Sequence, residues 1–237
     1  MGVLLFAGAD RMEFDGLLRR CRNVTRMNWP VHWARAASLE GREIWMAANG
    51  AGPLRSAAIV EAALLESGGL PSALDAIVNI GFCGALDPGL RVGGIVVASA
   101  IVGPSGEFAA AQPVSSRAFT RGPVVSIDHV AQTAGEKKEL RASGAIAVEM
   151  EAAGMAPKVR EYEIRFFCVR SVSDLAGEGF SVDFNSAVRP DGRFDVARIL
   201  LAAVSKPWTR VPELLRLRSR CRKASETLGD FVASCRF

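Results

Sequence analysis

Two glutamates, Glu149 and Glu151, stand in the otherwise apolar segment AIAVEMEAAGMA at residues 145–156. A buried carboxylate without a partner costs several kcal/mol, unless hydrogen bonds or opposite charges offset that cost. A segment built for burial is therefore expected to use both acids, either in a network with other charged groups or in contact with a ligand.

Other polar or glycine-rich residues also follow strand-like runs. Ligands of open α/β sheets bind beyond the carboxyl ends of the strands, where such residues converge. One shared pocket with acids, an arginine and exposed backbone amides is predicted, which suits acid–base chemistry on a neutral, polar small molecule. Its members are Glu13, the loops at 50–52 and 81–84, Glu149, Glu151, Arg170, Ser173 and Asp174.

Each of these features has a simpler interpretation. Glu13 is also typical of a surface carboxylate in a first helical turn. The glycine loops are also typical of ordinary turns, and neither completes a dinucleotide or P-loop motif. Cys83 has only His32 and His129 as candidate bases, which disfavours a Cys–His nucleophile. The residue pattern alone predicts an α/β enzyme that acts on a small molecule.

The elements that must position these residues alternate along the chain. Apolar runs predict buried strands, and the segments 53–67 and 150–163 have helical patterns. The order predicts an α/β fold, in a chain that has the length of one large domain or two small ones, with a mixed sheet in which the strands at REIWM and GGIVVAS could pair antiparallel. The predicted strands are 3–8, 42–50, 76–84, 93–102, 123–127, 145–149 and 164–174.

Composition narrows the class of protein. The chain has 237 residues, 49% of them hydrophobic, and a formal net charge of +4, which does not demand a nucleic-acid partner. An odd count of five cysteines without metal-ligand spacing indicates a reducing compartment and no metal site. No segment resembles a signal peptide or a bilayer span, so we expect a cytoplasmic protein.

The C-terminal segment is predicted to form an amphipathic helix over about 211–235. Leu214, Leu217, Leu228 and Phe231 have spacings of one helical face, and Arg and Lys residues fill the other. Aromatic residues do not alternate with these basic residues as stacking platforms for bases would, which argues against single-stranded nucleic acid as a partner.

Four strings in the chain, in order, are FAGADRME, NIGFCGALDPGLRVGGIVVAS, AIAVEMEAAGMA and VRSVSDLA. Together they resemble the purine nucleoside phosphorylase and methylthioadenosine/S-adenosylhomocysteine nucleosidase superfamily. The likeness extends to about residue 177, and VEMEA followed by VRSVSD is its most specific part. The resemblance implies a single α/β domain over 1–237 with a central twisted mixed sheet flanked by helices. It also implies a homodimer or higher homo-oligomer and cleavage of the N-glycosidic bond of a nucleoside.

The resemblance also implies roles for particular residues. Glu13 would activate the attacking water, Glu151 would bind the ribose hydroxyls, and Asp174, oriented by Ser173, would protonate purine N7. That proton transfer would require a raised pKa of Asp174, which desolvation can provide. Glu149 is either a pocket residue or a structural one. The remaining residues expected at the substrate are Met150, Arg170, Phe82, Cys83, Gly84 and Gly52.

The chain departs from the phosphorylase pattern where phosphate would bind. No arginine precedes Gly81, and Phe82 replaces a small hydroxyl residue, although Arg11 and Arg170 remain candidate anion ligands. Hydrolysis without a cofactor is therefore favoured, with adenine released from a 5′-substituted adenosine. A phosphorylase that uses inorganic phosphate is the alternative, and a non-catalytic nucleoside-binding protein is a further one.

Other differences from the usual nucleosidase pattern bear on the substrate and on contact with a membrane. Val130 stands where a base-stacking aromatic is usual, and CGALDPGL is similar to the hopanoid-associated branch, which removes adenine from a lipid-linked nucleoside. The basic tail at 213–237 could then contact an anionic membrane surface.

Overall fold

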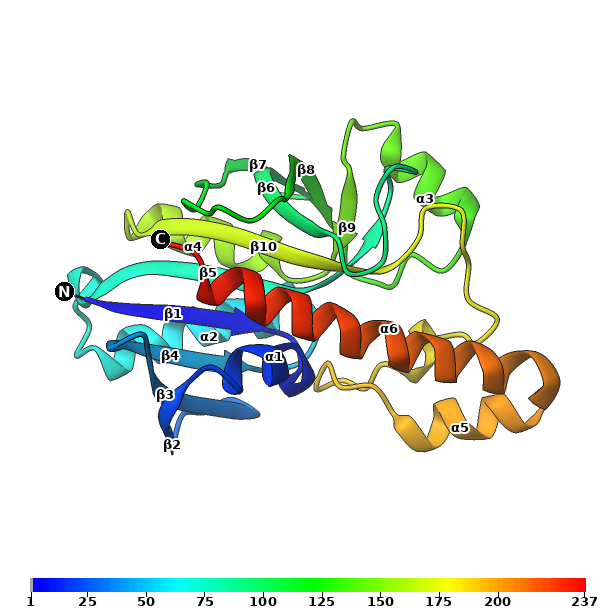
Figure 1. Ribbon diagram of the computed structural model, residues 1–237, viewed down its shortest axis with the longest axis horizontal. Coiled ribbons are helices and arrows are strands. Elements are labelled where there is room, and N and C mark those ends of the chain that lie inside the picture. The colour runs from blue at the N-terminus through cyan, green and yellow to red at the C-terminus, as the bar shows by residue number, and fades with distance from the viewer. Residues whose placement is uncertain (1) are drawn as a thin grey trace.

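The centre of the sheet is built from strands that are buried on both faces. In β1 (Val3–Gly8), Leu5 and Ala7 pack into one apolar cluster and Leu4 and Phe6 into the other. This two-sided burial explains why the strand reads as a continuous apolar run. The computed structural model describes residues 2–237 (Figure 1).

The strands form one mixed sheet in the order β10-β6-β8-β9-β5-β1-β4-β3-β2, with β7 paired to β6. An additional pairing of β10 with β5 closes five of these strands into a ring. The strands are β1, β2 (Arg22–Arg26), β3 (Trp33–Leu39), β4 (Arg42–Ala48), β5 (Leu74–Ala85), β6 (Ile95–Gly103), β7 (Gly106–Ala109), β8 (Thr120–Ser126), β9 (Ala147–Glu149) and β10 (Arg165–Asp174).

The pairing confirms a mixed sheet and refines its connections. β1 runs parallel to β4 and β5, and β5 runs parallel to β10. The two strands expected to pair antiparallel each do so with another partner, β4 with β3 and β6 with β10 and β7. β2, β3 and β7 were not predicted, and β2 is exposed along its whole length.

Helices cover both faces of the sheet. Side chains of α2 and α4 belong to one apolar cluster, and those of α1 and α6 belong to the other. In Figure 1, α6 crosses in front of β1 and β5. The α-helices are α1 (Asp15–Leu18), α2 (Pro53–Glu66), α3 (Ala134–Arg141), α4 (Ala152–Glu161), α5 (Val196–Val204) and α6 (Pro207–Ala233).

Glycines allow the helices within each layer to approach closely. A Cβ at Gly154 of α4 would overlap the backbone of Pro53 in α2, and one at Gly229 of α6 would overlap the backbone of Gly16 in α1. These contacts hold the first turn of α2 against the start of α4, near the predicted pocket.

The C-terminal helix has two different halves. Leu228, Phe231 and Val232 are buried in the core, whereas Leu215 is 61% exposed. The first half of α6 and the preceding α5 extend beyond the sheet as a helical hairpin (Figure 1). Within residues 2–237, no helix combines the length and apolar composition needed to cross a bilayer.

Candidate active site

The carboxylate of Glu13 links the ends of β1 and β5. Its Oε2 accepts hydrogen bonds from the backbone N–H groups of Ala9 (2.7 Å) and Asp10 (3.0 Å), and its Oε1 accepts one from Phe82 (3.0 Å). Asp10 caps the short 3-10 helix η1 (Arg11–Phe14), which carries Glu13 inward. Burial raises the pKa of Glu13, opposed by the Arg170 charge and these hydrogen bonds.

Glu149 caps the N-terminus of α4 from the end of β9. Its carboxylate accepts hydrogen bonds from the backbone N–H groups of Glu151 (2.9 Å) and Ala152 (2.9 and 3.0 Å), and it pairs with the Arg170 guanidinium. Because the side chain is fully enclosed and these partners engage both oxygens, Glu149 has the contacts of a structural residue.

Glu151 is held much more loosely than Glu149. The hydrogen bond that its carboxylate makes within the described chain joins Oε2 to Arg170 Nη1 at 3.1 Å. Burial raises the pKa of Glu151 to about 8, against the lowering effect of Arg170, and the charges of Glu149 and Glu13 raise it further. Glu151 is therefore a buried carboxyl with spare hydrogen-bonding capacity.

Arg170 is the counter-ion of both glutamates. The fully buried guanidinium pairs with Glu149 and Glu151 and donates to Oδ1 of Asn79, whose amide in turn donates to the Ala7 carbonyl at 3.1 Å. Gly81 makes room for this arrangement, since a Cβ there would lie 2.6 Å from Glu13 Oε1. The cluster thus joins β1, β5, β9 and β10.

Asp174 ends β10 and has two side-chain partners. Ser173 Oγ donates to Asp174 Oδ1 at 2.7 Å and lies 3.2 Å from the Cys83 carbonyl oxygen, and Lys137 Nζ pairs with Oδ2. Lys137 also donates to the Leu175 carbonyl at 2.9 Å and is 1% exposed. Sequence reasoning missed Lys137, because nothing in GEKKEL distinguishes it from its exposed neighbour Lys138.

The other predicted residues lie around these groups. Phe82, Gly84 and Met150 are half-buried, and a Cβ at Gly84 would lie 2.9 Å from Asp174 Oδ2. Gly52 has a φ of +109° at the start of α2, a conformation that favours glycine. Cys83 is buried, and burial raises the pKa of its thiol, so it lacks the properties of a nucleophile.

A cavity of about 240 Å³ opens beside the Glu13 loop. It brings Arg11, one of the two candidate anion ligands, together with Arg193 and His32. Arg193 was not predicted at the site, and His32 was a candidate only as a base for Cys83. The other candidate, Arg170, is instead enclosed with the glutamates. The cavity is lined by Ala9, Asp10, Arg11, His32, Trp33, Ala48 and Arg193.

The raised pKa of Glu151 predicts a pH-dependent stability. Its folded-state pKa lies near 8 and its ordinary value is 4.5, so its contribution is fully present below pH 4.5 and is lost as the pH rises through 8. We expect the free energy of unfolding of the ligand-free protein to fall by a few kcal/mol from pH 5 to pH 9. Glu151→Gln should flatten this decrease in urea titrations.

The exposed Glu61 provides the matched control, because Glu61→Gln removes a surface carboxylate whose ion pair within residues 2–237 is with Lys158. Its pH profile should follow that of the wild type. Parallel profiles for Glu151→Gln and the wild type would contradict the assignment of this titration to Glu151.

The fold and the family of the chain are matched by known proteins. The sequence profile of the phosphorylase superfamily matches residues 25–115 and 108–205, more than half of the chain. The chain therefore belongs to the phosphorylase superfamily, a superfamily of enzymes, which confirms the resemblance drawn from its motifs.

Solved structures share the fold along almost the whole chain. A 5′-methylthioadenosine/S-adenosylhomocysteine nucleosidase from Neisseria meningitidis, in complex with methylthio-immucillin-A, is 20% identical, with a TM-score of 0.72 over 99% of this chain and 98% of that one. A mutant of the Helicobacter pylori nucleosidase with 5′-methylthioadenosine is 16% identical, with a TM-score of 0.72 over 98% and 96%. A mutant futalosine hydrolase from Helicobacter pylori is 16% identical, with a TM-score of 0.72 over 99% and 98%.

Proposed function

We propose that this protein hydrolyses the N-glycosidic bond of a purine nucleoside and releases adenine from a 5′-substituted adenosine. The observation that carries the proposal is the arrangement of Glu13, Glu151 and Asp174, three buried carboxyl groups near the ends of β1, β9 and β10, strands that each pair with β5. The similarity in fold to nucleosidases supports the same reaction class. The reaction needs water and these side chains, with no metal or organic cofactor.

Glu13 is the proposed general base for the attacking water. Three backbone N–H groups fix its carboxylate, and burial raises its pKa, which increases its affinity for a proton taken from water. Oε2 accepts two hydrogen bonds and Oε1 accepts one, so Oε1 retains a lone pair to which a water molecule can donate.

Glu151 is the proposed ligand of the ribose 2′ and 3′ hydroxyls. Two O–H donors would favour its ionised form, and the resulting negative charge would stabilise the positive charge that develops on the sugar as the bond breaks. The Arg170 guanidinium offsets the cost of burying this carboxylate and occupies only part of its hydrogen-bond acceptor sites.

Asp174 is the proposed acid that protonates purine N7, which turns the base into a better leaving group. Ser173 orients one carboxyl oxygen, and Lys137 pairs with the other. In the proposed reaction the Asp174 carboxyl group delivers a proton to N7, and the Lys137 ammonium lies beside the carboxylate that this transfer leaves.

Phosphorolysis remains the second candidate because of one observation. Arg11, Arg193 and His32 line the cavity beside Glu13, where an anion could be bound. Arg170 is not available to bind an anion, since its guanidinium is enclosed by Glu149, Glu151 and Asn79.

Release of the free base with and without phosphate tests the proposal. Methylthioadenosine, adenosine and inosine would each be incubated with the enzyme, and the base and the sugar product quantified by chromatography. We expect adenine and a free sugar at the same rate in both buffers. Formation of a sugar 1-phosphate, with no release in phosphate-free buffer, would instead establish a phosphorylase. Tight nucleoside binding without release would indicate a binding protein.

A further inference from the structure

The hairpin of α5 and the first half of α6 exposes a large apolar surface. We define the hairpin as residues 196–223. In α5, Val196, Leu200 and Val204 form a stripe with exposed fractions of 57–70%, and Leu201 beside it is 73% exposed. Of the nine residues of α5, only Ala203 is buried. An exposed apolar surface of this kind is typical of an interaction site.

A second apolar stripe lies on α6. Trp208, Val211 and Leu215 have the i, i+3, i+7 spacing of one helical face, and Trp208 is 92% exposed at the start of the helix. The same line along the helix continues with Arg218 and Arg222, one to two turns farther from the tip. The stripe is therefore apolar near the tip and basic towards the body of the protein.

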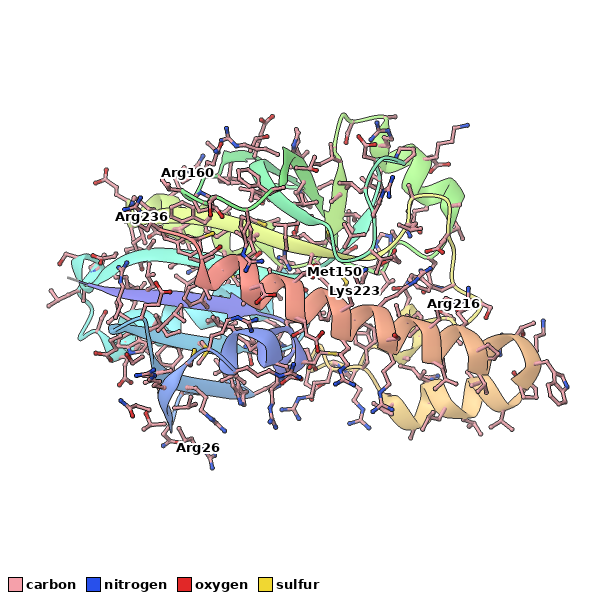
Figure 2. All side chains as sticks on the ribbon, in the orientation of Figure 1. Arg26, Met150, Arg160, Arg216, Lys223 and Arg236 are labelled. Carbon is pink, nitrogen blue, oxygen red and sulfur yellow. The ribbon has the colours of Figure 1, made fainter. Side chains whose placement is uncertain are left out.

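The charge of the hairpin differs from that of the rest of the chain. Residues 196–223 contain eight basic side chains and one acidic side chain, which leaves 21 basic and 24 acidic ones elsewhere. The hairpin is therefore strongly positive and the rest is slightly negative. Arg216 and Lys223 both project from α6 (Figure 2), and within the described chain the Arg220 guanidinium pairs with Glu178.

We propose that the hairpin docks the protein on an anionic lipid bilayer. Val, Leu and Trp side chains at the tip enter the interface between headgroups and acyl chains, and the arginines and lysines bind anionic headgroups. A tryptophan at the tip suits this interface, because its ring is apolar and its N–H is polar. The net negative body orients the molecule with the hairpin towards the membrane.

A second copy of the chain fits the hairpin less well. Pairing two hairpins would bury the apolar stripes but would also bring two strongly positive segments together. An anionic bilayer satisfies both the apolar and the basic side chains, which is why we assign the surface to lipid.

Vesicle co-sedimentation tests the proposal without any nucleoside, so it is independent of the proposed hydrolysis. The full chain would be mixed with vesicles of phosphatidylcholine alone or of phosphatidylcholine with 30% phosphatidylglycerol. We expect at least tenfold stronger binding to the anionic vesicles, reduced by salt. Trp208 fluorescence should shift to the blue on binding, because Trp29 and Trp45 are already buried and Trp33 is half-buried against Phe14.

Three double variants separate the contributions of the apolar and the basic side chains to vesicle binding. Leu201→Asp with Trp208→Asp should lower binding at least tenfold, and Arg216→Glu with Arg218→Glu should remove the preference for anionic lipid. Leu65→Asp with Leu70→Asp is the matched control, since both leucines are exposed outside the hairpin, at 75% and 61%. It should bind as the wild type does.

Three outcomes would overturn the proposal. The first is an absence of binding to anionic vesicles at low salt, and the second is equal binding by the wild type and the Leu201/Trp208 variant. The third is a concentration-dependent dimer, measured without lipid by sedimentation velocity, that the Leu201/Trp208 variant abolishes. That result would assign the hairpin to a second copy of the chain.

Discussion

Replacing Asp174 by asparagine is expected to lower the rate constant for adenine release by roughly 10²- to 10⁴-fold, the usual contribution of a positioned general acid. The amide keeps the shape of the side chain and can still accept a hydrogen bond from Ser173, but it cannot deliver a proton to N7. Single-turnover release from methylthioadenosine measures the effect, because it isolates the chemical step from product release.

Asp87 offers a matched control for this substitution. It pairs with Arg141 of α3, as Asp174 pairs with Lys137 of the same helix, but it is partly exposed. Asp87→Asn should leave the single-turnover rate within about twofold, since an exposed ion pair contributes little. A similar rate for Asp174→Asn and Asp87→Asn would remove Asp174 from the role of acid.

Replacing Arg170 by methionine is expected to destabilise the protein by about 3–5 kcal/mol, because it leaves Glu149 and Glu151 buried without their counter-ion. Arg170→Lys should recover only part of this loss, since an ammonium cannot reproduce the planar fork that reaches Glu149, Glu151 and Asn79 together. Urea unfolding of each variant measures the free energy.

Arg165 is the control, because it lies on the same strand and its side chain donates to exposed backbone carbonyl groups. Arg165→Met should cost no more than about 1 kcal/mol. Equal losses for Arg165→Met and Arg170→Met would mean that the buried cluster does not contribute to stability as the ion pairs imply.

The central strands could be predicted from the sequence because they are buried on both faces, and an apolar run such as VLLFAG is then unambiguous. β2 and β3 lie at the edge of the sheet, where RNVTR is exposed throughout and has no apolar signal. α5 was missed for a different reason. Val196, Leu200 and Val204 have the spacing of one helical face, but that face is exposed, whereas the usual rule places such a face on the core.

In the candidate site, too, some residues could be predicted from the sequence and others could not. Glu13, Glu151 and Asp174 could be selected because their motifs resemble those of a family, and the position of Arg170 near the strand ends followed from its place in VRSVSD. Its partners could not be predicted, because the Arg170 pairs span 19 and 21 residues and depend on how β9 lies in the sheet. Lys137 lies in the polar helix α3 and is its one buried residue. Nothing in the sequence of this helix distinguishes Lys137 from the exposed residues around it.

β5 pairs with β1, β9 and β10, and it also supplies backbone groups to the proposed catalytic residues. The Phe82 N–H donates to Glu13, and the Cys83 carbonyl oxygen lies within reach of Ser173 Oγ. A local opening that exposed these amides to hydrogen exchange would have to separate the central strands, so its free energy should approach that of global unfolding. The carboxyl groups are thus preorganised at the part of the chain that opens least, and entry of a substrate must rely on the irregular segments around them.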